Sequence, residues 1–159
     1  MGMIKIPKNA IKHFEENYPS IFETGNLAEG KWNKELGDFF DLYTNSKGAV
    51  PFCSNGAGLI AILKLLKEYK GYTNIFIQSN TMYGVKTIAE TSGLKLVGMV
   101  PCSLPSLMPS LLQFKEFVSK LDNPKTSVFL MSHIGGIVNP EILEIVNLCN
   151  SHGIALVED

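Results

Sequence analysis

Length, composition and charge describe an ordinary globular chain. It has 159 residues, of which 45% are hydrophobic and 18% charged, and a formal net charge of −1, so we expect one domain with a substantial core and no electrostatic attraction to nucleic acid or to an acidic membrane. All fourteen basic residues are lysines, which excludes recognition of base edges or carboxylates by arginine.

The cysteines and the N-terminus indicate a cytoplasmic protein. Cys53, Cys102 and Cys149 are widely spaced and form no Cys-x-x-Cys pair, so we expect three reduced, mostly buried thiols rather than a disulfide framework or a zinc site. Residues 1–7 lack the long apolar core of a signal peptide, and no apolar run reaches the length of a membrane span. We therefore predict a cytoplasmic location, no metal and no membrane partner.

The first 45 residues are predicted to form a separate helical arm. The spacing of apolar residues predicts a helix over 8–17, which Pro19 ends, and a loop over 22–30. A second helix is predicted over 31–43, and its apolar stripe is interpreted as core packing. The stripe consists of Trp32, Leu36, Phe39, Phe40 and Tyr43.

Beyond the arm, short apolar segments alternate with helical ones over residues 46–159. Strands are predicted over 49–53, 75–77, 94–100, 127–131 and 154–157. Helices are predicted over 59–69, 83–91, 110–121 and 140–151, and the first of them is expected to bury Ile60, Leu63, Leu65 and Leu66. Most of the strands are continuously apolar, which is typical of a parallel sheet covered on both faces. We therefore expect a three-layer α/β/α domain with a mainly parallel sheet.

A turn of small residues follows the first predicted strand. Ser54, Asn55, Gly56 and Ala57 precede a helix, where free backbone N–H groups and the helix dipole favour an anion such as a phosphate group. The turn has neither the Gly-x-Gly-x-x-Gly pattern nor the Gly-Lys-Ser/Thr of a P-loop, so nucleotide binding of those kinds is disfavoured. The alternative is a plain tight turn.

A second turn follows the predicted strand over 75–77. Asn80 or Thr81 is placed to cap the next helix. Met82 or Tyr83 is placed to cover a flat ring at the edge of the sheet. The alternative is a helix cap followed by two core side chains.

Ionisable side chains stand at the ends of the last two predicted strands. His133 comes just beyond a buried strand and shortly before two glycines, and Glu158 and Asp159 end the final strand. Parallel strands bring their carboxyl ends to the edge of the sheet where ligand sites are built, so we predict site roles for His133 and Asp159. The carboxylate of Asp159 would need a partner, which a protonated ring nitrogen would supply. The alternatives are a structural histidine and a solvated chain end.

In their order and spacing, five segments resemble the DegT/StrS-type sugar aminotransferases, which are pyridoxal-phosphate enzymes of the aspartate-aminotransferase fold. These segments are Thr24–Trp32, Ser54–Ala57, Asn80–Tyr83, Ser132–Gly136 and Ile154–Asp159. The fourth is similar to the family's Val-His-x-x-Gly segment, and the fifth to its strand ending in Glu-Asp. Together the five segments extend over nearly the whole chain.

The resemblance implies a large cofactor-binding domain of fold type I, with pyridoxal 5'-phosphate as cofactor. Its phosphate group would lie at the Ser54–Ala57 turn, its ring against Met82 or Tyr83, and its ring nitrogen at Asp159. His133 and Asp159 would be the catalytic residues of this part of the enzyme. The implied partners are a nucleotide-linked keto sugar, an amino donor, for which glutamate is expected, and a second copy in a homodimer of the complete protein.

The chain also departs from the family pattern. The phosphate-binding threonine of the family is Ala57 here, and Ser54 is the nearby hydroxyl that would replace it. The stacking aromatic aligns with Met82, which shifts the ring contact to Tyr83. The lysine that forms the Schiff base in this family lies beyond Asp159, so we expect a cofactor-binding domain over 46–159 that is incomplete at its C-terminus and inactive alone.

The sequence leaves several functions open. The leading hypothesis is an aminotransferase that acts on nucleotide-linked keto sugars. A sugar dehydratase of the same family, in which histidine replaces the lysine, differs from it at a position beyond Asp159. A truncated or split gene product without catalysis is another alternative, and a phosphosugar- or nucleotide-binding domain outside the family is the last.

Overall fold

The computed structural model describes residues 5–159, and the chain divides into two units, residues 1–51 and 52–159. Residues 1–4, which belong to the segment where the sequence predicts no signal peptide, lie outside the described residues. None of the described helices is long and apolar enough to cross a membrane. The domain organisation expected from the sequence, an arm over 1–45 and a partial cofactor-binding domain over 46–159, stays a prediction.

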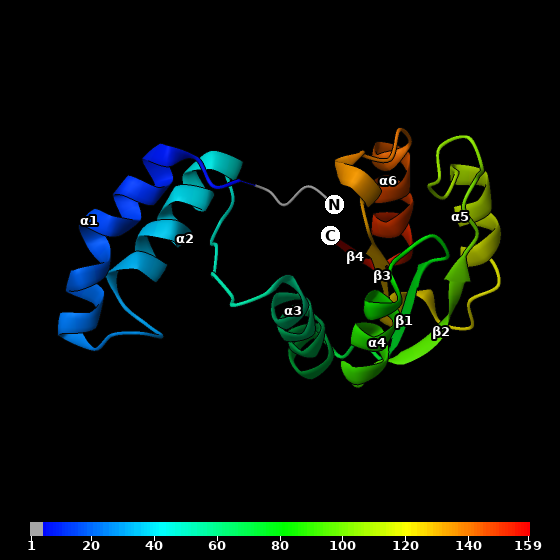
Figure 1. Cartoon of the computed structure of the whole chain (residues 1–159). Coiled ribbons are helices and arrows are strands. Elements are labelled where there is room, and N and C mark those ends of the chain that lie inside the picture. Colours follow the sequence, from blue (N-terminus) through cyan, green and yellow to red (C-terminus); the bar gives the residue numbers. More distant parts are fainter. Residues whose placement is uncertain (1–4) are drawn as a thin grey trace. The chain divides into compact units, whose positions relative to one another are not determined.

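The first unit contains helices α1 (Lys8–Thr24) and α2 (Lys31–Thr44), shown in blue and cyan in Figure 1. The prediction that Pro19 ends the first helix is wrong, because α1 continues through it. An interior proline removes one N–H from the helical ladder and crowds the preceding carbonyl, but α1 accommodates Pro19 and ends instead at Gly25. There φ is 71°, and the Gly25 N–H caps the carbonyls of Ile21 and Phe22.

The aromatic stripe of α2 is exposed, so its interpretation as core packing is wrong for the described chain. Phe39, Phe40 and Tyr43 contact one another at centroid distances of 5.4 to 6.5 Å, yet 57, 44 and 75% of their surfaces are exposed. The residue that α2 does bury is Gly37. A Cβ at this position would lie 2.7 Å from the carbonyl oxygen of Ala49, so glycine is required where the chain leaving α2 passes close to it.

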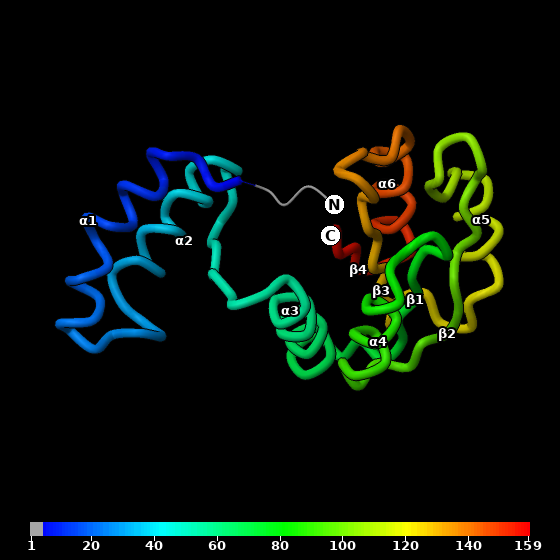
Figure 2. The backbone as a smooth tube through the Cα atoms, in the orientation of Figure 1, coloured from blue at the N-terminus to red at the C-terminus, as the bar shows by residue number. Residues whose placement is uncertain are grey.

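The second unit is a parallel sheet with helices on both faces, so the predicted α/β/α architecture is confirmed (Figure 1). The strands are β1 (Asn74–Gln78), β2 (Lys95–Val100), β3 (Ser127–Met131) and β4 (Ala155–Glu158), in the order β2-β1-β3-β4. The helices are α3 (Asn55–Lys70), α4 (Tyr83–Thr91), α5 (Leu111–Val118) and α6 (Ile142–His152), with short 3-10 turns at Pro124–Thr126 and Ile134–Gly136. Figure 2 follows the chain from β1 through α4 to β2, and from β3 through α6 to β4.

The predicted strand over 49–53 is wrong. This segment does not pair with the sheet, whose first strand in the chain is β1. Pro51 at its centre lacks the N–H that a central strand donates to the ladder. Val50 and Phe52 are 74 and 50% exposed, and a Cβ on Gly58 would touch the Phe52 ring at 3.5 Å. The apolar run is therefore an extended connection that leads into α3.

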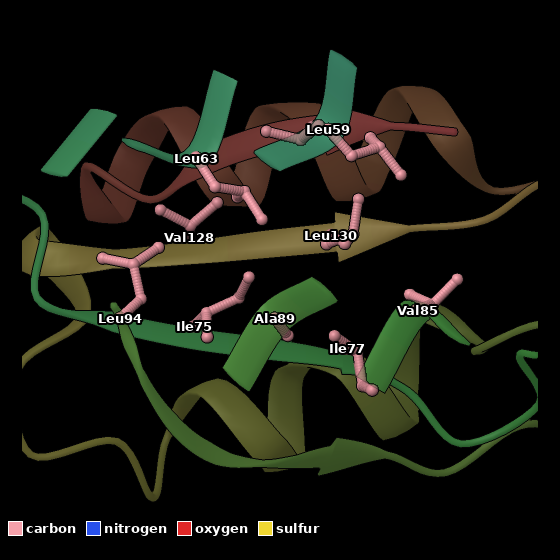
Figure 3. Packing of buried hydrophobic residues seen from close by; sticks show 10 residues of the cluster. Leu59, Leu63, Ile75, Ile77, Val85, Ala89, Leu94, Val128 and Leu130 are labelled. Carbon is pink, nitrogen blue, oxygen red and sulfur yellow. The ribbon is translucent and has the colours of Figure 1, made fainter. Parts of the chain in front are cut away.

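Two apolar layers sandwich the sheet, because residues on both faces of its central strands are buried. Helices α3 and α4 pack on one face, where the residues are Leu59, Leu63, Ile75, Ile77, Val85, Ala89, Leu94, Val128, Leu130 and Val157 (Figure 3). Helices α5 and α6 pack on the other face, around the stacked rings of Phe76 and Phe129. Burial on both faces fixes the register of the strands, and so fixes which residues stand at their carboxyl ends.

The buried residues of α3 match the prediction only in part. Leu63 is buried as expected, and Ile60 and Leu66 are half-buried, but Leu65 is 56% exposed. Leu59, which was not expected in the core, is buried with Leu63 because the two stand one helical turn apart. The helix starts at Asn55 rather than at residue 59, and this earlier start brings the turn of small residues into its first turn.

The three cysteines are free, in agreement with the predicted lack of disulfides, but their burial differs. Cys149 is buried, Cys102 is intermediate and Cys53 is exposed, so the expectation of mostly buried thiols is wrong for Cys53. Burial raises the pKa of the Cys149 thiol to about 12.

Candidate functional site

Polar residues from four separate segments meet at the carboxyl edge of the sheet. Asn55 begins α3, Gln78 ends β1, Ser132 follows β3, and Asp159 follows β4. Hydrogen bonds join all four, although Asn55 and Asp159 are 104 positions apart in the sequence. The edge therefore collects the segments that the sequence singled out, and Asp159 lies at their meeting point.

The backbone of Asp159 pairs with the end of β3 and the residues that follow it. Its N–H donates to the carbonyl oxygen of Met131 at 2.8 Å, and its own carbonyl oxygen accepts from the N–H of His133 at 2.6 Å. These two bonds extend the β3–β4 pairing by one residue beyond Glu158. The alternative of a solvated chain end is therefore contradicted for the Asp159 backbone.

The side chain of Asp159 accepts a neutral donor on each carboxylate oxygen. Asn55 Nδ2 donates to Oδ1 at 2.6 Å, and Ser132 Oγ donates to Oδ2 at 3.2 Å. Within residues 5–159, no lysine or histidine lies within ion-pair distance of this carboxylate. The two donors orient the group, but they leave its negative charge without a cationic partner.

His133 forms a separate pair with Glu158. Its Nε2 lies 2.8 Å from Glu158 Oε2, and the histidine side chain is only 16% exposed. Its Nδ1 is buried and has no hydrogen-bond partner among the described residues. The backbone of His133, rather than its ring, is the part that contacts Asp159. The catalytic role predicted for the His133 ring therefore stays a prediction.

The small-residue turn is the first turn of α3. Ser54 is the N-cap, because its Oγ accepts from the N–H of Ala57 at 3.2 Å. That amide is therefore already engaged, and Gly56 is half-buried, with Ile88 of α4 3.5 Å from where its Cβ would be. The side chain of Asn55 points to Asp159. Phosphate binding by Ser54, Asn55, Gly56 and Ala57 stays a prediction that rests on the position of this helix N-terminus.

The helix cap predicted in the second turn is wrong. Neither Asn80 nor Thr81 caps α4, whose N-cap is Met82 without a side-chain bond. Asn80 donates to the carbonyl oxygen of Leu107 at 2.9 Å instead, and Thr81 Oγ1 lies 3.3 Å from Ser132 Oγ.

The two candidates for a ring contact are not core residues. Met82 and Tyr83 are 72 and 79% exposed, which contradicts the alternative that placed them in the core. The ring of Tyr83 lies 5.8 Å from the ammonium group of Lys86. Both side chains are thus accessible next to the edge, and their contact with a cofactor ring stays a prediction.

Sequence reasoning missed Gln78 and gave Ser132 no role. Gln78 is fully buried, and its amide binds the backbone of Ser132. The signal that could have found it is a polar residue at the last position of an otherwise apolar strand. Such a side chain must find partners inside the protein, and Gln78 finds them in the backbone of Ser132, which follows the neighbouring strand, and of Asn80 in the loop after its own strand.

Comparison with protein families decides the relationship. The model of the DegT/DnrJ/EryC1/StrS aminotransferase family matches residues 9–159. The chain belongs to this family. The family resemblance expected from the sequence is thereby confirmed, over nearly the whole chain.

A solved structure agrees with the fold of this aminotransferase-family chain. DesV from S. venezuelae, solved in complex with a ketimine intermediate, is similar with a TM-score of 0.69 at 17% identity over 98% of the chain. TlmJ, an aminotransferase from Streptoalloteichus hindustanus, aligns with a TM-score of 0.45 at 22% identity over 64% of the chain. The chain spans 42% of the length of DesV and 27% of that of TlmJ. No curated protein sequence matches it.

Proposed function

We propose that the chain is part of a pyridoxal-phosphate-dependent aminotransferase that transfers an amino group from glutamate to a nucleotide-linked keto sugar. Membership of the aminotransferase family supports the reaction class. The sugar substrate, the donor, a cytoplasmic location and a homodimer of the complete protein are parts of the same proposal. The Schiff-base lysine would come from residues beyond Asp159 in a longer protein.

The observation that carries the proposal is that the Asp159 carboxylate is oriented but has no cationic partner among the described residues. It stands at the carboxyl edge of a parallel sheet, where ligand sites are built, and it is oriented by two neutral donors. No cation of the described residues neutralises it. A protonated ring nitrogen has the opposite charge that such a group lacks, and the carboxylate would favour the protonated form of that ring. The residues at this edge therefore fit the cofactor.

The remaining residues have definable tasks in this proposal. When bound, pyridoxal phosphate supplies an electron sink that is strongest with its ring nitrogen protonated. The N-terminus of α3 would hold the phosphate group, aided by the helix dipole. Met82 or Tyr83 would cover one face of the ring, since both are accessible. His133, whose backbone N–H binds the carbonyl oxygen of Asp159, would be the second catalytic residue of this edge.

Calorimetric titration with pyridoxamine 5'-phosphate tests the cofactor site. This form of the cofactor has no aldehyde, so it cannot react with the fourteen lysines of the chain. We expect saturable binding by the native chain and a loss of about tenfold or more in affinity for Asp159→Asn, because a charge-assisted contact becomes a neutral one. Glu158→Gln is the matched control, since Glu158 contacts His133 and not Asp159. Equal binding by Asp159→Asn and the native chain would refute the role of Asp159.

The reaction class is tested by reading the gene past the codon for Asp159. A reading frame that continues to a lysine in a later loop supports an aminotransferase. A histidine at that position would support the dehydratase alternative, and a stop codon would exclude catalysis by this chain without a partner.

A further inference from the structure

A buried glutamine completes the β1–β3 pairing at the edge of the sheet. Gln78 is 0% exposed. Its Nε2 donates to the carbonyl oxygens of Ser132 at 2.8 Å and Asn80 at 2.7 Å, and its Oε1 accepts from the N–H of Ser132 at 3.3 Å. Both protons of the amide and its oxygen are therefore used. The last paired residues of the two strands are Ile77 and Leu130, so the glutamine side chain continues the pairing where the backbones no longer do.

The backbone around Ser132 is held from two sides. On the β1 side, Gln78 binds both the N–H and the carbonyl oxygen of Ser132. On the β4 side, the Asp159 backbone binds the residues directly before and after Ser132. A segment with these four bonds cannot shift toward either strand without breaking at least one of them. The direction in which the Ser132 side chain leaves the backbone is thereby fixed.

The hydroxyl of Ser132 has a defined hydrogen-bond direction. It is almost fully buried and lies 3.2 Å from Asp159 Oδ2 and 3.3 Å from Thr81 Oγ1. An ionised carboxylate only accepts, and a hydroxyl has a single proton. Ser132 therefore donates to Asp159, and the Thr81 hydroxyl donates to Ser132. The result is a directed chain of hydroxyl groups that ends on one oxygen of the carboxylate.

The two donors to Asp159 differ in their exposure to water. Asn55 is exposed, so water competes with its bond to Oδ1, although that bond is the shorter one. Ser132 is only 4% exposed, so its bond to Oδ2 is shielded. Hydrogen bonds in a less polar environment are electrostatically stronger and are not exchanged with solvent. Ser132 is thus the donor that keeps the plane of the carboxylate in one orientation.

We propose that Ser132 is a positioning residue for Asp159, and that Gln78 holds Ser132 in place, so that the carboxylate presents its charge to the ring nitrogen of the cofactor. The proposal rests on the proposed function of this edge as a cofactor site. The family segment that this stretch resembles has valine at the position of Ser132, and valine cannot donate.

The test compares two ligands that differ only at the ring nitrogen. One is pyridoxamine 5'-phosphate, and the other is its analogue in which a C–H group replaces that nitrogen. Calorimetry gives the affinity of the native chain and of Ser132→Ala, Ser132→Thr and Asp159→Asn for both. The preference is the ratio of the affinity for pyridoxamine 5'-phosphate to the affinity for the C–H analogue. Because a hydrogen bond to a charged group contributes measurably to its placement, we expect this ratio to be about tenfold lower in Ser132→Ala than in the native chain. The affinity for the C–H analogue should stay unchanged, and Ser132→Thr should restore the preference.

Each outcome decides something. A preference kept in full by Ser132→Ala would overturn the proposal while leaving the cofactor site intact. An equal loss of affinity for both ligands would also overturn it, because it would indicate a structural role alone. A native chain that binds neither ligand would refute the proposed function itself. A native chain that binds both equally would refute the role of Asp159 and the role of Ser132 with it.

A second variant tests Gln78 without relying on ligand binding. Gln78→Met keeps the volume of the side chain but removes its amide. We expect hydrogen exchange at the Ser132 N–H to accelerate by about tenfold or more, because that N–H loses its protein acceptor. Protection at Ile77 and Leu130, which pair through the backbone, should remain. Unchanged protection at Ser132 would show that Gln78 does not hold it.

Discussion

Removal of the contact between Asn55 and Asp159 should uncouple the start of α3 from the end of β4. The bond is 2.6 Å long and joins an amide to a carboxylate across 104 positions of sequence. A shielded bond of this kind contributes about 1.5–3 kcal/mol. Asn55 is exposed and Asp159 only partly buried, so competition with water reduces the expected value to about 1 kcal/mol.

A double-mutant cycle measures this coupling. The variants are Asn55→Ala, Asp159→Ala and the double variant, and the assay is the free energy of unfolding from urea denaturation followed by circular dichroism. A matched cycle replaces Asp159→Ala by Glu158→Ala, because this neighbouring carboxylate binds His133 and not Asn55. We expect a coupling of about 1 kcal/mol in the first cycle and less than about 0.3 kcal/mol in the second. Equal coupling energies in the two cycles would refute the contact.

Three further predictions concern the framework of the site. Phe129→Ala should lower the free energy of unfolding by about 3–5 kcal/mol, because this fully buried ring has two neighbouring rings at 5.0 and 4.9 Å. The control Leu65→Ala, on the exposed side of α3, should change the free energy of unfolding by less than about 0.5 kcal/mol. Similar losses for the two variants in urea denaturation would contradict the assigned faces. Ser54→Ala should cost about 1 kcal/mol through loss of the N-cap, and an unchanged unfolding midpoint would exclude that cap. Burial raises the pKa of the Cys149 thiol to about 12, while a thiol in the unfolded chain titrates near about 8.5. As the pH rises, the Cys149 thiol therefore loses its proton in the unfolded chain first, which favours unfolding. The stability that the protonated thiol contributes is complete below about pH 8.5 and falls by about 1.4 kcal/mol per pH unit above it. Cys149→Ala should remove that slope, and a slope equal to that of the native chain would contradict the explanation.

The sequence predicts the sheet well because the sheet is buried on both faces. β3 matches the predicted strand over 127–131 in full, and α4 matches the predicted helix over 83–91. Continuous apolar runs and helical periodicity are strong signals when tertiary burial and local propensity agree. The same signals fail over 49–53, where Pro51 interrupts a short apolar run and no neighbouring strand pairs with it.

At the site, position was predictable but contacts were not. The alternation of strands and helices places Asp159 and Ser132 at one edge, and the structure joins them. The prediction that Asn80 or Thr81 caps α4 was wrong, because Asn80 donates to the carbonyl oxygen of Leu107 and the Thr81 hydroxyl lies within hydrogen-bond distance of Ser132. Such a choice depends on side chains brought near by the fold, which spacing along the chain does not reveal. Gln78 was missed for the same reason.

The protonation state of the cofactor ring is the most direct test of the account. It is measured by the nitrogen NMR shift of pyridoxamine 5'-phosphate labelled with ¹⁵N in the ring, bound to the native chain and to Asp159→Asn. At a pH at which the free ring nitrogen is deprotonated, we predict a protonated nitrogen in the native complex and a deprotonated one in the variant. The same shift in both complexes would contradict the claim that Asp159 holds the ring nitrogen of the cofactor.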